Sequence, residues 1–534
     1  MSVPASGQLN AVDRVVSWFR PQAGVDRLRA RTQLALASSR IAYTGARRDR
    51  AQTRNWRPPP GSADSHVLPA IADLRDRSRD LTRNAPLAVG AMNAALTETV
   101  GVGFTVKAAI DGTLLGLSDD EADAWERRAE RIFRTLARTR QLDVTRRLTF
   151  AAQTYQLVWS TLEAGDTLVV RRASRRKGEL LSTKFQFVEA DRVSNRDDAP
   201  DTRRSVAGVE FDGEGVPLRY SVRNTHPDDH RWQEALDASW TAVPAYGKSG
   251  QRISWLFMRQ MRPDQTRGVP WLAPVVEALK EIAEYGANEL AASVVNSLFS
   301  VIVKTDIGDE ETSRIVQAAE AGTPKPTAPD LDLRSGLVLE ADPTDVFEFV
   351  DPKRPNVSFE QFVLAWVRQI GSALGIPYEV LIRHFSSSFS ASQAAMLEAY
   401  RFFMVWQQWV VDDWCQPAYE LVVYEAVTTG LLEAPGFLDD ALIRQAWLGT
   451  KWIGPRRGVI RPDMEVQAAA QGVREGFTTI EDEAARLYGG DFEKIHEQRA
   501  REIRLRREAG LDIEPVGERV LVESAEDPFE EGTK

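Results

Sequence analysis

The sequence has little of the chemistry on which many enzymes and secreted proteins depend. Its 534 residues include one cysteine, Cys415, and five histidines. A single cysteine excludes a disulfide framework and a zinc site built from several cysteines, and it favours assembly in a reducing cytosol. The few histidines leave few candidates for general acid–base catalysis. We therefore expect no cofactor.

Long uncharged runs are also missing. The longest one near the middle is Leu290–Val303, which is shorter than the ~20 residues that a helix needs to cross a bilayer. Asp13 and Arg14 stand where a secretory signal would need its apolar stretch. We expect neither a membrane span nor a membrane partner.

The composition that remains is that of an ordinary globular protein, with 43% hydrophobic and 27% charged residues and a net charge of −10. A chain of this length suggests about three to four domains. The acidic balance excludes a globally basic nucleic-acid-binding protein. Fourteen tryptophans are many, and tryptophan is typical both of large interfaces and of cores.

Charge is distributed unevenly along the chain. Residues 1–60 hold eleven arginines and three aspartates, a net charge of +8, and residues 511–534 hold eight acids and two basic residues, a net charge of −6. Both ends have the composition of arms or tails. The basic arm is either a solvated segment or a contact with an acidic partner or nucleic acid.

Hydrophobic periodicity predicts a mainly helical α+β protein. Helices are expected over 73–99, closing at Gly101 and Gly103, and over 119–140, followed by a strand-rich stretch from about 165 to 260. A hairpin is expected from 206–211, a turn at 212–215 and a strand at 218–222, because alternating β-branched and aromatic residues flank a glycine-rich turn.

Two long helices flank a small insertion. Apolar residues recur with helical spacing over 271–298, while Glu277, Lys280, Glu281 and Glu284 fall on the opposite stripe. A short α/β insertion at about 300–350 follows, and a second helix runs from a capping box at Ser358 to Gly375. Since neither helix can bury its apolar face alone, neighbouring subunits are the expected partners. The charged stripe faces either outer solvent or the lumen of an assembly.

The rest of the chain, from residue 383 onward, is expected to form a polar loop followed by several helices. A serine-rich loop at 383–389 precedes an aromatic helix over 391–428, which Ser390 and Gln393 are expected to cap and Pro417 to kink. Further helices are expected over 463–475, 479–488 and 491–509. The loop is either a plain surface connection or part of a functional surface.

Motifs for catalysis are weak. Gly247-Lys248-Ser249 lacks the earlier glycine of a phosphate-binding loop, since position 242 is alanine. His226 and His230 have the spacing of a metal pair, but Pro227 and the acids between them favour a loop and no third ligand is indicated. Acidic pairs at 119–121, 412–413 and 439–440 lie at expected helix ends, where carboxylates are common. We expect no metal site and no enzyme activity.

Five segments in order resemble the portal proteins of lambda-type tailed bacteriophages. They are residues 72–104, the hairpin 208–220 with His226-Pro227, Gly268–Pro274, Ile370–Tyr378 followed by Ser388–Ser390, and 452–481. No single segment is specific, but together they span most of the chain. The Asp-Pro pair usual before the C-terminal helices is present only as Arg461-Pro462.

The resemblance implies a portal fold that assembles as a ring, with a basic arm (1–60), a wing (61–268), stem helices (269–299 and 356–376), a clip (300–355), a tunnel loop (377–392), a long wing helix with its connection (393–454), and a crown with an acidic tail (455–534). It places Arg383, His384, Ser386, Ser387 and Ser388 at the DNA channel. Within this arrangement we expect Glu277, Lys280, Glu281 and Glu284 to line the channel of the stem, and Trp271, Trp366 and Phe362 to pack between subunits.

The partners that the resemblance implies are other copies of the chain in a ring of typically twelve, and double-stranded DNA that passes without sequence recognition. They also include a terminase, the major capsid or scaffolding protein, and head-completion or tail adaptor proteins. The expected location is the portal vertex of a virion assembled in the bacterial cytoplasm. Two other classes stay open: a metal-dependent nucleic-acid enzyme using His226 and His230, and a head–tail adaptor or minor capsid protein that forms no ring.

Overall fold

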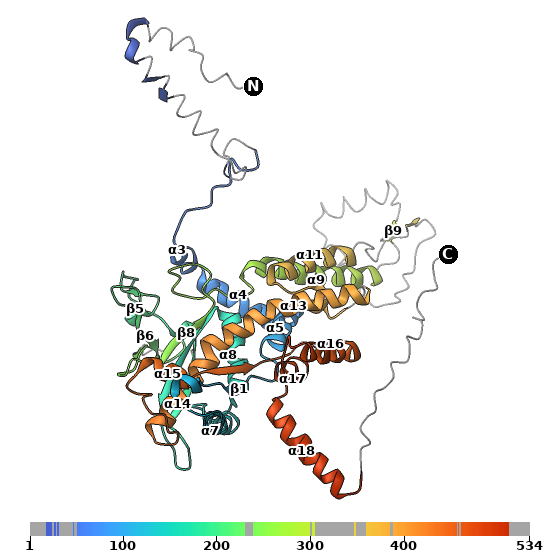
Figure 1. Ribbon diagram of the computed structural model, residues 1–534. Helices are drawn as coiled ribbons and strands as arrows, with labels where there is room; N and C mark the ends of the chain where they lie inside the picture. Colours follow the sequence, from blue (N-terminus) through green and yellow to red (C-terminus); the bar gives the residue numbers. More distant parts are fainter. Residues whose placement is uncertain are drawn as a thin grey trace, which may run out of the picture. The chain divides into compact units, whose positions relative to one another are not determined.

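The computed structural model describes residues 18–23, 26–27, 29–30, 46, 51–229, 239–298, 302–304, 346–348, 359–384, 388–456, 458 and 461–511. The chain forms two compact units, 1–65 and 66–534. Most of the basic arm lies outside the described residues. Everything that follows concerns the second unit, whose elements are labelled in Figure 1.

Helices dominate this unit, as the sequence predicts. Those from residue 63 to 164 are α3 (Ala63–Val67), α4 (Ile71–Asn84), α5 (Pro86–Thr99), α6 (Gly112–Leu115), α7 (Asp119–Arg138) and α8 (Phe150–Ala164). Later helices are α9 (Val276–Leu298), α11 (Phe359–Leu374), α12 (Tyr378–Ile382), α13 (Phe389–Val410), the π-helical segment η6 (Val411–Cys415), α14 (Gln416–Thr428), α15 (Ala441–Trp447), α16 (Pro462–Arg474), α17 (Ile480–Tyr488) and α18 (Phe492–Glu508).

The described strands form four antiparallel sheets. One has the order β3-β2-β8, from β2 (Asp166–Ala173), β3 (Thr183–Glu189) and β8 (Ser254–Met258), and another runs β4-β5-β6-β7, from β4 (Ser205–Val206), β5 (Val209–Phe211), β6 (Pro217–Arg223) and β7 (Trp240–Pro244). The two-stranded sheets pair β1 (Thr105–Ala108) with β11 (Thr450–Ile453), and β9 (Ile302–Lys304) with β10 (Val346–Glu348). Short 3₁₀ turns are η2 (Ala190–Arg192), η3 (Arg196–Asp198) and η5 (Ala273–Val275).

Strand β2 lies at the centre of the unit and is covered on both faces. Val169 belongs to the main hydrophobic core, whereas Leu168 and Val170 belong to a second cluster shared with the four-stranded sheet. Successive side chains of a strand point to opposite faces. The continuous apolar run at the start of β2 is therefore what a strand between two cores requires.

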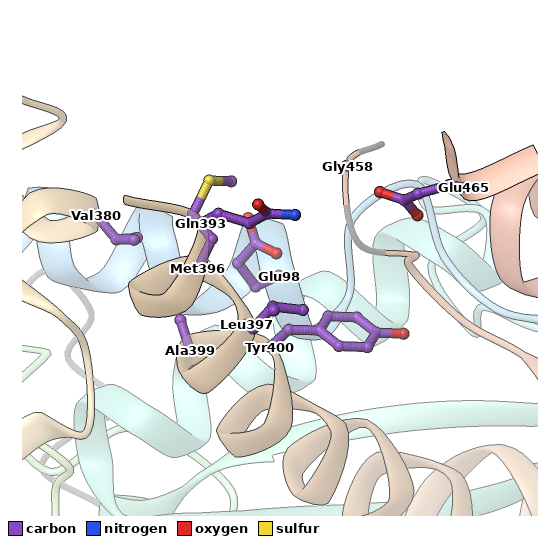
Figure 2. Close-up of a pocket in the computed structure, with 9 residues that line it drawn as sticks. All are labelled: Glu98, Val380, Gln393, Met396, Leu397, Ala399, Tyr400, Gly458 and Glu465. Atoms are coloured by element: carbon purple, nitrogen blue, oxygen red, sulfur yellow. The ribbon is translucent and has the colours of Figure 1, made fainter. Parts of the chain in front are cut away.

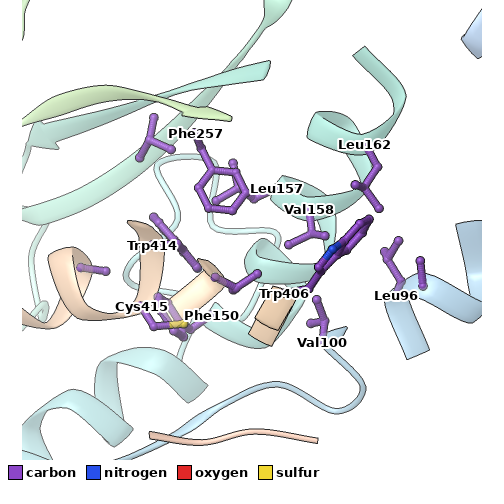
Figure 3. Close-up of a cluster of buried hydrophobic side chains, with 14 of the residues drawn as sticks. Leu96, Val100, Phe150, Leu157, Val158, Leu162, Phe257, Trp406, Trp414 and Cys415 are labelled. Carbon is purple, nitrogen blue, oxygen red and sulfur yellow. The ribbon is translucent and has the colours of Figure 1, made fainter. Parts of the chain in front are cut away.

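The main core joins helices that are far apart in the sequence. Leu96 and Val100 from α5 and its end, Phe150 and Leu157 from α8, and Trp406 from α13 belong to one buried cluster (Figure 3). Within it Trp414 stacks on Phe150 at 5.2 Å between ring centroids, and its indole N–H donates to Thr154 Oγ1 at 2.8 Å. Satisfying the polar atom of a buried indole keeps this large apolar contact favourable.

Most helix boundaries confirm the sequence analysis to within a few residues, and three details differ. The expected strand 206–211 is split by a tight turn at Ala207-Gly208, where both residues have positive φ (46° and 86°), so β4 and β5 form a hairpin of their own. The expected helix 73–99 is two helices, because Pro86 lies in the first turn of α5 and ends the hydrogen-bond ladder of α4. The expected irregularity near Pro417 is the π-helical segment η6 directly before it.

Candidate functional site

Helices α9 and α11 lie side by side and reach away from the core (Figure 1). The ring of Tyr285 on α9 stacks on Phe359 of α11 at 5.4 Å and meets Phe362 edge-on at 5.2 Å. Among the side chains that the structure describes on these two helices, the buried ones lie at the start of α9 and the end of α11, and they include Leu279 and Ile370. The paired strands β9 and β10 show that the chain which leaves α9 returns toward α11, as the sequence predicts.

The charged stripe of α9 is exposed along its length. Glu277, Lys280, Glu281 and Glu284 are all exposed, and Lys280 Nζ lies 3.5 Å from Glu284 Oε1. An ion pair this exposed contributes little to stability. The stripe is thus free of any structural task in the single chain, and its expected place along a channel stays a prediction.

Large apolar side chains are also exposed on the same helices. Leu290 and Val294 of α9 are 68% and 51% exposed, and Phe362 of α11 is 46% exposed. Helix α13 adds four more exposed apolar residues, which are Met396, Leu397, Met404 and Val405. These exposed apolar side chains are available for contact with a partner.

The three residues expected in subunit packing have different surroundings. Trp271 is half-buried and packs edge-on against Trp406 of its own chain at 5.3 Å. Trp366 is half-buried beside Phe362, with ring centroids 6.2 Å apart. Phe362 is the most exposed of the three, so it has the most surface left for a neighbour.

The serine-rich loop begins at a fixed point. Arg383 ends α12 in the left-handed conformation with φ of 54°, and the N–H of His384 donates to the carbonyl of Glu379 at 3.1 Å. Arg383 and His384 are both exposed. Residues 385–387, which include Ser386 and Ser387, lie outside the described residues. Ser388 is the N-cap residue of α13, so that helix begins two residues before the expected cap at Ser390.

A groove that the sequence analysis missed adjoins this loop. Glu98 at the end of α5, Val380 of α12, Tyr400 and neighbouring residues of α13, and Glu465 of α16 line it, and it encloses about 50 Å³ (Figure 2). Burial raises the pKa of Glu98 above its usual value. A glutamate at the end of an otherwise apolar helix is a weak sequence signal. The groove is too small for more than a few atoms.

The weaker catalytic candidates have structural roles where the structure describes them. Gly247-Lys248-Ser249 lies in a turn closed by the bridge between Tyr246 and Arg252. Burial raises the pKa of the Cys415 thiol well above its usual value, as expected of a packed cysteine. The N-terminal acids of α7 include Glu121, which forms a capping box with Ser118.

Of the two histidines considered as metal ligands, the structure describes only His226. His226 Nε2 lies 3.7 Å from Glu189 and 3.9 Å from Asp191, but Asp191 already pairs with Arg79. His230 lies outside the described residues, and among those described no cluster of three metal-ligating side chains is found. Within the same residues, no helix is long and apolar enough to span a bilayer.

The chain is similar to phage portal proteins along most of its length. Residues 49–407 match the family model described as phage portal protein, lambda family. Portal protein B of Escherichia phage lambda is 24% identical over 478 residues, which cover 86% of this chain and 89% of that protein. The portal protein of Escherichia phage N15 is 25% identical over 479 residues, with the same coverage.

Among solved structures, a chain of the virion of a native gene transfer agent particle aligns with a TM-score of 0.42 at 11% identity. The alignment covers 80% of this chain and 94% of that one. At this TM-score the similarity indicates nothing about how the chain assembles.

Proposed function

The chain belongs to the lambda family of phage portal proteins, and on that basis we propose that it assembles into a ring of about twelve copies at one capsid vertex and conducts double-stranded DNA. The observation that carries this proposal is the exposed apolar surface of α9, α11 and α13. Head-to-tail contacts between neighbours would bury these side chains, and such contacts close into a ring when the rotation fits. Other proposed partners are the terminase, the capsid or scaffolding protein, and the head-completion or tail adaptor proteins.

The proposal places α9 and α11 in the stem and the segment between them in the clip. The stripe of Glu277, Glu281 and Glu284, with Lys280, would line the channel. Repeated carboxylates repel phosphates and would keep DNA sliding, because each cation in contact with a phosphate adds binding that resists movement. Arg383 or His384 would add one charged contact per subunit at the loop.

Measuring the mass of the purified chain and imaging it by negative-stain microscopy test the ring directly. A ring of many copies supports the proposal. A monodisperse monomer that stays monomeric with its packaging partners contradicts it and favours a non-ring adaptor or minor capsid protein.

The lining of the stem has its own test. Replacing Glu277, Glu281 and Glu284 with glutamine should leave rings intact but slow DNA passage in a salt-dependent way. A matched control removes three exposed carboxylates elsewhere, at Glu214, Glu475 and Glu508. Equal effects of both sets, or none from the first, would place the stripe on the outer surface.

We also propose that the chain is a conduit without catalytic activity, and that a separate ATPase supplies the work of packaging. The pure protein should not hydrolyse ATP. Hydrolysis that is abolished by Lys248→Ala would contradict this, and an activity lost on adding a chelator would favour the metal-dependent enzyme instead.

A further inference from the structure

This acidic chain carries a surface on which exposed cations outnumber exposed carboxylates. Arg127, Arg128 and Arg131 of α7 line one shallow hollow. The loop before β3 contributes Arg175, Arg176 and Lys177, which line a second hollow together with Thr135 of α7 and the buried Glu179. These six cations are called the basic face. It is separate from the stem and from the serine-rich loop.

Helical spacing turns the arginines outward. Trp125, Ala129, Phe133 and Leu136 bury one side of α7 against the core. Side chains three and four residues apart share a helix face. Because Arg127 and Arg131 are four apart and are not on the buried side, they point to solvent, and both are exposed.

The carboxylates of the same segments are used inside the protein. Glu130 accepts from the backbone N–H of Ala108 at 3.2 Å and pairs with Arg134 at 3.0 Å. Asp143 accepts from the backbone of the following turn, and Glu179 pairs with Lys184 at 2.8 Å. As a result, no carboxylate is exposed within 124–147 or 171–180, although Glu126 is half-exposed and Asp123, one helical turn before Arg127, is exposed.

The six cations of the basic face are therefore only partly neutralised, with Asp123 as the exposed carboxylate one helical turn from Arg127. In the described part of the chain no ion pair joins any of them to a carboxylate. Like charges on one surface repel one another, and the repulsion is relieved when a polyanion binds.

We propose that the basic face binds the phosphate backbone of double-stranded nucleic acid without reading its sequence. Five of the six cations are arginine, whose planar fork matches phosphate oxygens. The 20 residues of α7 span ~30 Å, close to one turn of a duplex. No aromatic residue lines either hollow among the described residues. Stacking surfaces of that kind are typical of single-strand binding, so a duplex is the better fit.

The proposal is tested on the full chain with a short random-sequence DNA duplex, by fluorescence anisotropy over a range of salt concentrations. If all six cations contact phosphates, log K should fall with log salt with a slope of about −5. The variant Arg127→Gln/Arg128→Gln/Arg131→Gln should roughly halve that slope and weaken binding at least about tenfold near physiological salt. Arg175→Gln/Arg176→Gln/Lys177→Gln should do the same.

Two control variants distinguish an effect of the basic face from an effect of net charge. Replacing the three arginines of α7 with lysine keeps the charge and should keep most of the slope. Arg196→Gln/Arg203→Gln/Arg204→Gln removes three equally exposed charges elsewhere and should leave the slope unchanged. An equal loss from this control would mean that net charge, and not the face, governs binding.

The proposal would also be overturned if neither the triple variant of α7 nor the triple variant at 175–177 changed the affinity for DNA. If those variants instead lost ring assembly, the face would contact an acidic protein surface. Since the assay needs no channel, its outcome is independent of the proposed conduit function.

Discussion

Asp166 and Arg267 form a fully buried, two-point ion pair. Arg267 Nε donates to Asp166 Oδ2 and Nη2 donates to Oδ1, both at 2.8 Å, and neither residue is more than 2% exposed. The remaining guanidinium N–H groups donate to the carbonyls of Ala190, Val193 and Ala207. The pair fixes the start of β2 to the segment that leads into α9, so it positions the proposed stem on the core.

Breaking this pair should destabilise the whole unit. Asp166→Asn leaves the buried Arg267 without its carboxylate partner, and we expect a loss of about 3–5 kcal/mol in the free energy of unfolding. Arg267→Met should cost less, because Asp166 keeps its second ion pair with Arg75 at 3.3 Å. Urea denaturation measures it. The matched control is Glu210→Gln, which breaks the exposed pair with Arg219 at the same 2.8 Å distance and should cost less than about 1 kcal/mol. Similar losses at the two sites would contradict the assigned role of burial.

The start of β2 and the segment that leads into α9 also approach each other closely at Gly165 and Gly268. A Cβ added at Gly268 would lie 1.9 Å from the carbonyl oxygen of Gly165, so one of the two segments would have to move. We expect Gly268→Ala to lower the unfolding free energy by about 1–3 kcal/mol or more. Gly213→Ala, which meets nothing within 4 Å, should change it little. Thermal melts compare the two, and a silent Gly268→Ala would show that the approach is looser than described.

Exposed apolar residues of the stem should matter for assembly and not for folding. Leu290→Asp and Val294→Asp place charges in surface that neighbours would bury, and we expect loss of rings with an unchanged melt of the single chain. Trp366→Ala should weaken assembly as well, since truncating a tryptophan that becomes buried costs on the order of 3–5 kcal/mol. Light scattering gives the mass. The control Leu218→Asp changes an exposed leucine outside the stem, and rings that survive Leu290→Asp would remove this part of α9 from the interface.

The serine-rich loop should affect DNA retention alone. Replacing Ser386, Ser387 and Ser388 with glycine would remove the proposed neutral hydrogen bonds to phosphate. The left-handed turn at Arg383 and the start of α13 should persist, because glycine is tolerated at an N-cap. Rings should form normally, and packaged heads should leak DNA, measured as nuclease-sensitive DNA. Heads that package and retain DNA like the parent would return the loop to a plain surface connection.

Acid should destabilise the folded chain through Glu179, which pairs with Lys184 of β3. Burial alone would raise its pKa, but hydrogen bonds from Lys184, the backbone of Arg176 and Arg146 outweigh burial and lower the pKa from the ordinary 4.5 to about 2. A depressed pKa stabilises the folded state above the ordinary value, and that contribution is lost as the pH falls from about 4.5 toward 2. Glu179→Gln should flatten the pH dependence of unfolding in this range. An unchanged profile would mean that other carboxylates dominate acid unfolding.

Local features were predictable because they depend on spacing within a few residues. The charged helix α7, the end of α11 at Gly375 and the N-caps Thr479 and Asp491 follow from period, capping residues and glycine in the left-handed region. The out-and-back stem pair and the family resemblance came from the same kind of pattern. The split of the expected strand 206–211 was missed because a tight turn at Ala207-Gly208 interrupts an otherwise strand-like run.

Long-range pairings were decided only by the tertiary structure. Asp166 and Arg267 are 101 residues apart, and no local pattern links them. The basic face shows the same limit: the six acids and five arginines of α7 nearly cancel in the sequence. Packing against β1 turns Glu130 inward and leaves Arg127 and Arg131 in solvent. Sequence periodicity thus determined which residues share a helix face, while burial of one face determined which charges this protein presents to its partners.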